Sequence, residues 1–236
     1  MKIFIFFLLT FCDIYSVNLD SRFLKKSDPK AYRIANIPLR SSWWSRPTEY
    51  AWAGKFIEKD LVVLDAACGI SHPFKWLLGL TCKETWACDI DKRINNIDHI
   101  LFETLSDLGS IAHTELKKHK SIFPKVHLCH EDITKLPKEM PLFDRIFCIS
   151  TLEHMKNEER LKALKEFANK LKPDGYLILT VDYPEIKPKE LLQIALRANL
   201  IPAGQVETGL PYKGCITNGH LFVYCCVLKL GERKSS

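Results

Sequence analysis

The sequence predicts an α/β protein with a doubly wound, mostly parallel sheet of seven strands. From residue 61 onward, short apolar runs of strand length alternate with stretches of helical spacing. Strands that alternate with helices favour a parallel sheet with right-handed crossovers. The last two apolar runs lie close together in the sequence, so we expect an antiparallel C-terminal edge strand. An N-terminal helical cap is expected before the first strand of the sheet.

The length of 236 residues suits one sizeable core with extensions. Changes of composition divide the chain into an apolar leader, an aromatic helical cap, the α/β domain and a short tail. These parts are residues 1–16, 17–60, 61–230 and 231–236. Prolines in the cap predict short helices separated by turns.

The α/β domain is expected to contain seven strands and five helical stretches. The strands are expected at 62–64, 85–88, 126–128, 145–149, 176–181, 204–208 and 221–230. The helices are expected at 73–80, 91–108, 111–119, 157–171 and 188–199. The helix at 157–171 has the clearest amphipathic pattern, with a run of apolar residues on one face.

Composition excludes some classes of protein. The hydrophobic fraction of 47% argues against a disordered chain, and the net charge of +6 comes from scattered basic residues. With no basic stripe, a nucleic-acid partner is disfavoured. The nine cysteines show no C-x-x-C spacing and lie mostly in apolar runs, which indicates buried thiols in a reducing compartment. No metal site is expected.

The N-terminal leader has one lysine followed by about ten apolar residues, the size of a signal-peptide core and too short to span a bilayer. It could be a secretory signal, an interfacial anchor or a misassigned start. Because no A-x-A cleavage site follows and free cysteines fit poorly with export, we expect a cytoplasmic protein. Residues 3–12 leave weak membrane association open, and export or anchoring is the alternative. The oligomeric state is left open.

The segment Leu61–Leu78 predicts a ligand site. It contains a buried strand, the carboxylate of Asp65, a turn of small residues and a helix start. Ser71 is a suitable N-cap, and Pro73 lies close to the first helical position. A strand that passes through small residues into a helix places backbone donors beside a possible ligand.

Polar groups also follow the next strands of the predicted sheet. Asp89, Asp132 and Ser150 each stand where an apolar run ends. Ligands of open α/β sheets bind beyond the carboxyl ends of the strands, so these groups are candidates for one site. Asp89 comes 20 residues after Gly69, the interval at which an acidic residue accepts the ribose hydroxyls of a nucleotide. Because G-x-G-x-x-G is absent, we expect a ribose but no need for a diphosphate.

Five motifs in order resemble those of class I S-adenosylmethionine-dependent methyltransferases. They are VLDAACGISHP, WACDID, HEDITKLP, FDRIFCISTLEHM and LKPDGYLILT. The resemblance covers roughly residues 61–230 and implies S-adenosylmethionine as the cofactor. It also implies a small or medium metabolite as the methyl acceptor, whose nucleophilic atom attacks the methyl group in line. The N/D-P-P-Y/F motif of similar enzymes that act on base or glutamine amino groups is replaced by ISTLEH.

The resemblance assigns residues to each part of the cofactor. The methionine end would lie at Asp65, Ala67 and Gly69, and the ribose hydroxyls at Asp89. The adenine would contact Ile90, Asp132 and Ile133. Ser150 would lie beside the reacting methyl group.

Two positions depart from the family pattern, because Ala67 and Ser71 stand where glycines are common. Alanine suits the turn only if its φ stays negative. Otherwise the loop differs, or cofactor binding is weakened or lost. A non-catalytic cofactor-binding or regulatory module is therefore one alternative, and a nicotinamide-dependent oxidoreductase is another.

Catalytic and substrate-binding candidates are less specific. If a general base is used, His154 and Glu153 are the nearest candidates in sequence, although His154 could equally cap a helix. The substrate candidates belong to a dense aromatic cluster of the cap, which could wall a pocket or only pack on the sheet. They are Trp43, Trp44, Arg46 and Tyr50.

Overall fold

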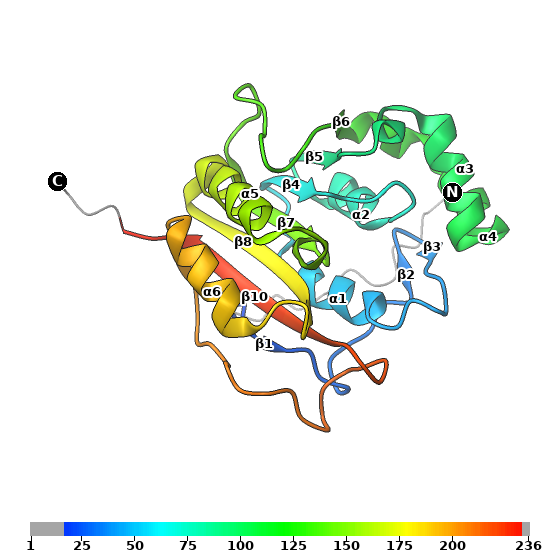
Figure 1. Ribbon diagram of the computed structural model, residues 1–236. Coiled ribbons are helices and arrows are strands. Elements are labelled where there is room, and N and C mark those ends of the chain that lie inside the picture. The colour runs from blue at the N-terminus through cyan, green and yellow to red at the C-terminus, as the bar shows by residue number, and fades with distance from the viewer. Residues whose placement is uncertain (1–16, 233–236) are drawn as a thin grey trace.

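A computed structural model describes residues 17–232 of the chain. Its centre is an eight-stranded sheet in the order β1-β10-β8-β7-β4-β5-β6, and β9 pairs along β10 (Figure 1). The strands of this sheet are β1 Arg22–Phe23, β4 Val62–Ala66, β5 Glu84–Asp89, β6 Val126–His130, β7 Phe143–Ile149, β8 Leu171–Tyr183, β9 Leu200–Pro202 and β10 Phe222–Leu230. Strands β4 to β8 are parallel neighbours, and β10 is antiparallel to β8. The predicted α/β class, with a mostly parallel sheet and an antiparallel C-terminal strand, is confirmed, but the sheet has eight strands and not seven because β1 joins it.

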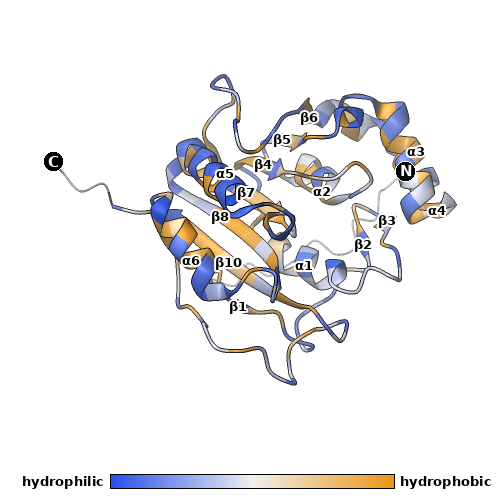
Figure 2. Ribbon diagram, in the orientation of Figure 1, coloured by the Kyte–Doolittle hydropathy of each residue, from blue (hydrophilic) through white to orange (hydrophobic). Residues whose placement is uncertain are grey.

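Helices cover both faces of this sheet. The α-helices are α1 Arg46–Ala53, α2 Phe74–Thr81, α3 Ile97–Leu108, α4 Ser110–Lys118, α5 Asn157–Lys170 and α6 Pro188–Arg197. Alternate strand residues point to opposite faces. In β4, Leu64 packs with α5 and α6, whereas Val63 packs with α1 and α2. Figure 2 shows the hydrophobic strands β8 and β10 beside the more polar outer sides of α5 and α6.

The strand order reverses between β4 and β7. From β4 the chain runs outward through β5 to β6, then returns to the other side of β4 with β7 and β8. In open α/β sheets, the crevice beyond the carboxyl ends at this reversal binds ligands. The site is therefore expected beyond the ends of β4 and β7.

The cap differs from the predicted series of short helices. Its residues before α1 form β1 and a small hairpin of β2 Arg33–Ile34 with β3 Ile37–Pro38. The reason is tertiary pairing, since β1 hydrogen-bonds with β10 and Phe23 is fully buried there. Only the helix expected after Pro47 forms as α1, followed by a 3-10 turn at Gly54–Phe56.

Two other element predictions are wrong in detail. The strand expected at 204–208 is β9 at Leu200–Pro202, because these residues take the free edge of β10. Residue 206 makes only an isolated bridge to Ser21. The helix expected at 91–108 is divided, because Asn96 accepts hydrogen bonds from the backbone N–H groups of Asp98 and His99 and caps a new helix. A 3-10 turn, Lys92–Asn95, precedes it.

Ser71 is not the N-cap of α2. Pro73 occupies that position and makes no side-chain cap. The Ser71 hydroxyl instead donates a hydrogen bond of 2.6 Å to Asp107 on α3. This hydrogen bond to Asp107 takes the place of an N-cap and connects the loop after β4 to α3.

The predictions for residues 1–16 and for most of the tail lie outside the described residues. Between residues 17 and 232, none of the helices combines the length and the apolar character needed to cross a bilayer. All eight cysteines in this part of the chain are free thiols.

Candidate active site

The turn after β4 forms the floor of the candidate site. Ala67 and Gly69 both adopt left-handed conformations, with φ of +53° and +64°. A Cβ atom at Gly69 would lie 2.6 Å from the His72 ring, so both backbone and space require glycine there. The condition that φ stay negative at Ala67 is therefore not met. Alanine carries the strain, which is about 1–2 kcal/mol for an L-residue in this region.

Hydrogen bonds from both sides hold this turn. The Gly69 N–H donates to Asp89 at the end of β5, over 2.8 Å. The Lys75 ammonium, on α2, donates to the backbone carbonyls of Gly69 and His72, each over 2.6 Å. Lys75 is fully buried and was not predicted as part of the site. Its signal in the sequence is a lone cation within the apolar run PFKWLL.

Asp65 is an unsatisfied acceptor beside the turn. The residue is 3% exposed, and its Oδ2 atom has no hydrogen-bond partner. Burial raises the pKa of Asp65 to about 7, and the Asp89 carboxylate adds to the rise while Lys75 opposes it. A buried acceptor without a partner costs free energy, so this atom is suited to receive a donor from a ligand.

The candidates for ribose and adenine contact lie along the neighbouring strand ends. Asp89 also accepts from the backbone N–H of Asp91, so each of its oxygens holds one backbone donor. Asp132 follows β6 and accepts from the backbone and hydroxyl of Thr134. Ile90 is 70% exposed, whereas Ile133 is buried in the core. Sheet order therefore brings the two carboxylates to one edge, but Ile90 and Ile133 differ sharply in exposure.

A buried carboxylate, Glu49, joins the cap to the sheet. Glu49 lies on α1, is fully buried and forms an ion pair with Arg46. It also accepts from the Ser150 hydroxyl over 2.5 Å and from the Thr180 hydroxyl over 2.9 Å. Ser150 follows β7 and has a φ of +43°. Arg46, Glu49, Ser150 and Thr180 thus form one network. Of these four residues, only Arg46 and Ser150 were predicted as site residues.

The imidazole of His72 lies against the cap. Its Nδ1 atom is 2.6 Å from the Tyr50 hydroxyl, and its ring stacks on Trp43 at a centroid distance of 4.5 Å. Burial, helped by the nearby charges of Arg46 and Lys75, lowers the pKa of His72 to about 3. This imidazole is therefore neutral near pH 7, and two aromatic side chains of the cap fix its orientation.

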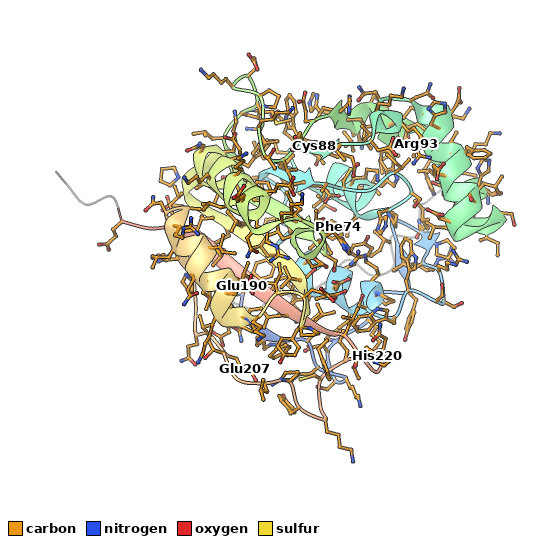
Figure 3. All side chains as sticks on the ribbon, in the orientation of Figure 1. Phe74, Cys88, Arg93, Glu190, Glu207 and His220 are labelled. Carbon is orange, nitrogen blue, oxygen red and sulfur yellow. The ribbon has the colours of Figure 1, made fainter. Side chains whose placement is uncertain are left out.

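Two cavities meet above these residues. The inner cavity, of about 110 Å³, lies over the turn after β4; Phe74, labelled near the middle of Figure 3, is on its wall. Its lining residues are Arg46, Tyr50, Asp65, Ala67, Cys68, Gly69, His72, Phe74, Ile149, Ser150 and Thr151.

The outer cavity, of about 250 Å³, lies under the cap. It is lined by Ser42, Trp43, Trp44, Ser45, Arg46, His72, Ser150, His154 and Asp182. Arg46, His72 and Ser150 line both cavities and form the wall between them.

The predicted residues distribute unequally between these cavities. Asp65, Ala67, Gly69 and Ser150 line the inner one, as does Tyr50, which was predicted for substrate. Trp43 and Trp44 line the outer one, and Arg46 lines both. The predicted nucleotide contacts at Asp89, Ile90, Asp132 and Ile133 line neither cavity and stand along the strand ends outside.

The two proton-transfer candidates also differ. His154 is exposed and lines the outer cavity, whereas Glu153 is 7% exposed and lines neither cavity. Both Glu153 carboxylate oxygens lack a partner, and burial raises its pKa to about 8. Asp182, at the end of β8, was not predicted. It would have been found by applying the strand-end rule to the run YLILTVD.

Comparison with known proteins agrees with this geometry. Residues 64–179 match the model of a methyltransferase domain. No curated protein sequence matches the chain. Among solved structures, it resembles a TehB-like S-adenosylmethionine-dependent methyltransferase from Corynebacterium glutamicum, with 14% identity over 77% of this chain and 86% of that one, and a TM-score of 0.51.

Two further structures share the fold. Magnesium protoporphyrin IX methyltransferase from Synechocystis PCC 6803, crystallised with S-adenosylmethionine, is 15% identical over 78% of this chain and 76% of its own, with a TM-score of 0.52. The [4+2]-cyclase SpnF is 12% identical over 86% of this chain and 87% of its own, with a TM-score of 0.55. At such identities the likeness shows the fold.

The chain thus has the class I S-adenosylmethionine-dependent methyltransferase fold. Residues 64–179 of this fold are identified as a methyltransferase domain. Within residues 17–232, no group of three His, Cys, Asp or Glu side chains is arranged to hold a metal ion.

Proposed function

We propose that this methyltransferase modifies a small molecule held in the outer cavity, with the amino-acid end of S-adenosylmethionine in the inner cavity. The observation that carries the proposal is the shared wall of Arg46, His72 and Ser150. Two adjoining cavities with a common wall allow two ligands to face each other, which is what group transfer requires.

The inner cavity fits an α-amino acid. Asp65 offers an unsatisfied buried acceptor to an ammonium group. Arg46 is paired with Glu49 through one guanidinium nitrogen, and its remaining N–H groups can donate to a carboxylate. The two ends of the amino acid therefore find an acceptor and a set of donors in the same cavity. The backbone of Ala67 and Gly69 lies between them as the floor.

The nucleoside end is assigned to the open strand ends. Asp89 retains acceptor capacity on both oxygens, because each oxygen holds one donor and a carboxylate oxygen can accept two. It would take the ribose hydroxyls. Asp132 would accept from the adenine amino group, with Ile90 and Ile133 as the apolar contacts.

When bound, S-adenosylmethionine supplies a methyl group on a positively charged sulfur, which leaves as a neutral thioether when the acceptor forms its bond to carbon. The protein's own part is positioning and exclusion of water. The network of Glu49 fixes Ser150 and Arg46 at the wall, and Tyr50 with Trp43 fixes His72. His154 reaches the outer cavity and is the nearest candidate to receive a proton from the acceptor.

Calorimetry with two ligands tests this assignment. S-adenosylhomocysteine carries the amino-acid end, and 5′-methylthioadenosine lacks it. We expect S-adenosylhomocysteine to bind at least about tenfold more tightly, since charge-assisted hydrogen bonds contribute about 1.5–3 kcal/mol each. Arg46→Ala should shrink this difference, and Arg93→Ala, on an exposed surface, should preserve it.

Two outcomes would overturn the proposal. Absence of S-adenosylhomocysteine binding at millimolar concentration would remove the cofactor site altogether. Equal affinity of the wild-type protein for both ligands would show that the inner cavity does not hold the amino-acid end. Neither outcome depends on the stability of a variant.

A further inference from the structure

The outer cavity contains a carboxylate that the methyltransferase assignment does not use. Asp182, at the end of β8, lines this cavity and is half-buried. Its Oδ1 atom is buried without a hydrogen-bond partner. Burial raises the pKa of Asp182 to about 6, and the neighbouring Glu49 carboxylate adds to this rise. A partly buried carboxylate in this condition is stabilised by a cation.

The cation already present in the cavity is committed elsewhere. Arg46 lines the outer cavity, but its guanidinium is paired with the fully buried Glu49. Within this pair, Arg46 offsets the charge of Asp182 only in part, because Glu49 raises the pKa of Asp182 more than Arg46 lowers it. Glu185, just after β8, adds negative charge nearby.

The imidazoles of the lining do not replace that cation. Near pH 7 His72 is neutral, because burial and the charges of Arg46 and Lys75 lower its pKa to about 3. His154 is exposed to solvent, so water screens its interaction with Asp182. The outer cavity is thus electrostatically negative on its Asp182 side.

Aromatic faces form the other side of the outer cavity. Trp43 and Trp44 are both half-buried, and both line it. Trp43 is held by its stack on His72, so its orientation is set before a ligand enters. Tryptophan faces attract organic cations, and they also pack on the apolar part of a ligand. A carboxylate and two indoles that line one cavity favour a cationic organic group.

We propose that the outer cavity selects a small organic cation, such as a protonated amine, which pairs with Asp182 and packs on Trp43 and Trp44. This inference rests on the proposed function for the identity of the cavity as the acceptor site. It concerns the charge that the cavity recognises. Neutral and anionic ligands of the same shape should bind less well, because they leave Asp182 unpaired or repel it.

A series of three ligands of similar shape and different charge tests the proposal. The probes are 2-phenylethylammonium, 2-phenylethanol and phenylacetate, titrated by ligand-observed NMR against protein saturated with S-adenosylhomocysteine. We expect the ammonium to bind at least about tenfold more tightly than the alcohol, as expected for a charge-assisted hydrogen bond together with a cation–π contact. Phenylacetate should bind most weakly.

Variants locate the effect within the cavity. Asp182→Asn keeps the shape of the side chain, and no hydrogen bond of the Asp182 carboxylate is present in the described structure to be lost. It should reduce the ammonium affinity about fivefold or more while leaving the alcohol within about twofold. Asp174→Asn, at the opposite end of β8 and exposed, is the matched control and should change neither affinity.

The outcomes separate this proposal from the proposed function. If S-adenosylhomocysteine fails to bind, the methyltransferase assignment of the cavities fails, and the ligand series on the protein alone still reports the charge preference. If S-adenosylhomocysteine binds but the alcohol or phenylacetate binds as tightly as the ammonium, only the cation proposal is overturned. Equal effects of Asp182→Asn and Asp174→Asn would also overturn it.

Discussion

The two cavities are built from different parts of the chain. The inner cavity rests on the turn after β4, where the strand order of the sheet reverses. The outer cavity owes its aromatic side to the cap, a segment of short strands and one helix that packs on the sheet. Under the proposed function, the sheet would fix the cofactor end and the cap would decide what faces it.

The largest expected effect comes from the residue that joins cap and sheet. Glu49→Ala removes the shared acceptor of Arg46, Ser150 and Thr180 and leaves the half-buried Arg46 cation unpaired. We expect the free energy of unfolding to fall by about 3–5 kcal/mol, the cost of breaking a buried ion pair. Denaturant titration measures it.

The matched control is Glu58→Ala. Glu58 pairs with Arg145 over 3.3 Å, but its side chain is 60% exposed. The loss should be about 1 kcal/mol or less, as for surface ion pairs. Similar losses in the two variants would mean that the cap does not depend on its buried network.

A smaller effect is expected on the affinity for the cofactor, which can be tested separately from the outer cavity. Asp89→Ala removes the predicted ribose acceptor, and we expect S-adenosylhomocysteine binding to weaken by roughly 1.5–3 kcal/mol in calorimetry. Asp91→Ala, on the exposed loop that follows, should bind almost as the wild type does. Wild-type affinity in the Asp89 variant would place the ribose elsewhere.

The next prediction concerns pH and Glu153. Its pKa is raised from about 4.5 to about 8 by burial, so ionisation is harder in the folded state. The contribution of Glu153 to the free energy of unfolding is therefore complete in acid, and it is lost as the pH rises from about 4.5 to about 8. Glu153→Gln should stabilise the protein at pH 9 by about 1–3 kcal/mol, the usual cost of an unsatisfied buried group.

Thermal unfolding at pH 9 and pH 5 measures this effect. The advantage of Glu153→Gln should disappear at pH 5, where the wild-type carboxyl is protonated. Glu158→Gln, on an exposed turn of α5, is the control and should show little change with pH. An advantage that is the same at both pH values would exclude ionisation as its cause.

The smallest expected effect tests the floor of the inner cavity. Ala67→Gly relieves a positive φ and should raise the free energy of unfolding by about 0.5–1 kcal/mol. Ala66→Gly, one residue earlier in β4, should instead lower it by a similar amount, because glycine costs entropy in a strand. Destabilisation by both substitutions would show that Ala67 is not strained.

The sequence predicted the sheet side of the site better than the cap side. Asp65, Asp89 and Asp132 were predicted to follow neighbouring strands, and they do, because strand order brings carboxyl ends to one edge of the sheet. Glu49 and Thr180 were not predicted, because their contact depends on how α1 packs against β8. Such docking leaves no periodic pattern in the sequence.

The left-handed turn at Ala67 could not be predicted for a related reason. Local preference favours a negative φ for alanine. The hydrogen bonds that hold the turn come from Asp89 and Lys75, which meet it only after folding. Tertiary contacts therefore override the local preference, and the same applies to Ser71, whose hydroxyl turns to Asp107 instead of capping α2.

In the proposed reaction the methyl group moves from the cofactor in the inner cavity to the acceptor in the outer cavity, beside Arg46, His72 and Ser150. A crystal structure with S-adenosylhomocysteine tests it most directly. We predict that the amino-acid end occupies the inner cavity between Asp65 and Arg46, with the thioether sulfur at this wall and open to the outer cavity. A sulfur that faces away from the outer cavity, or an amino-acid end outside the inner one, would contradict the account.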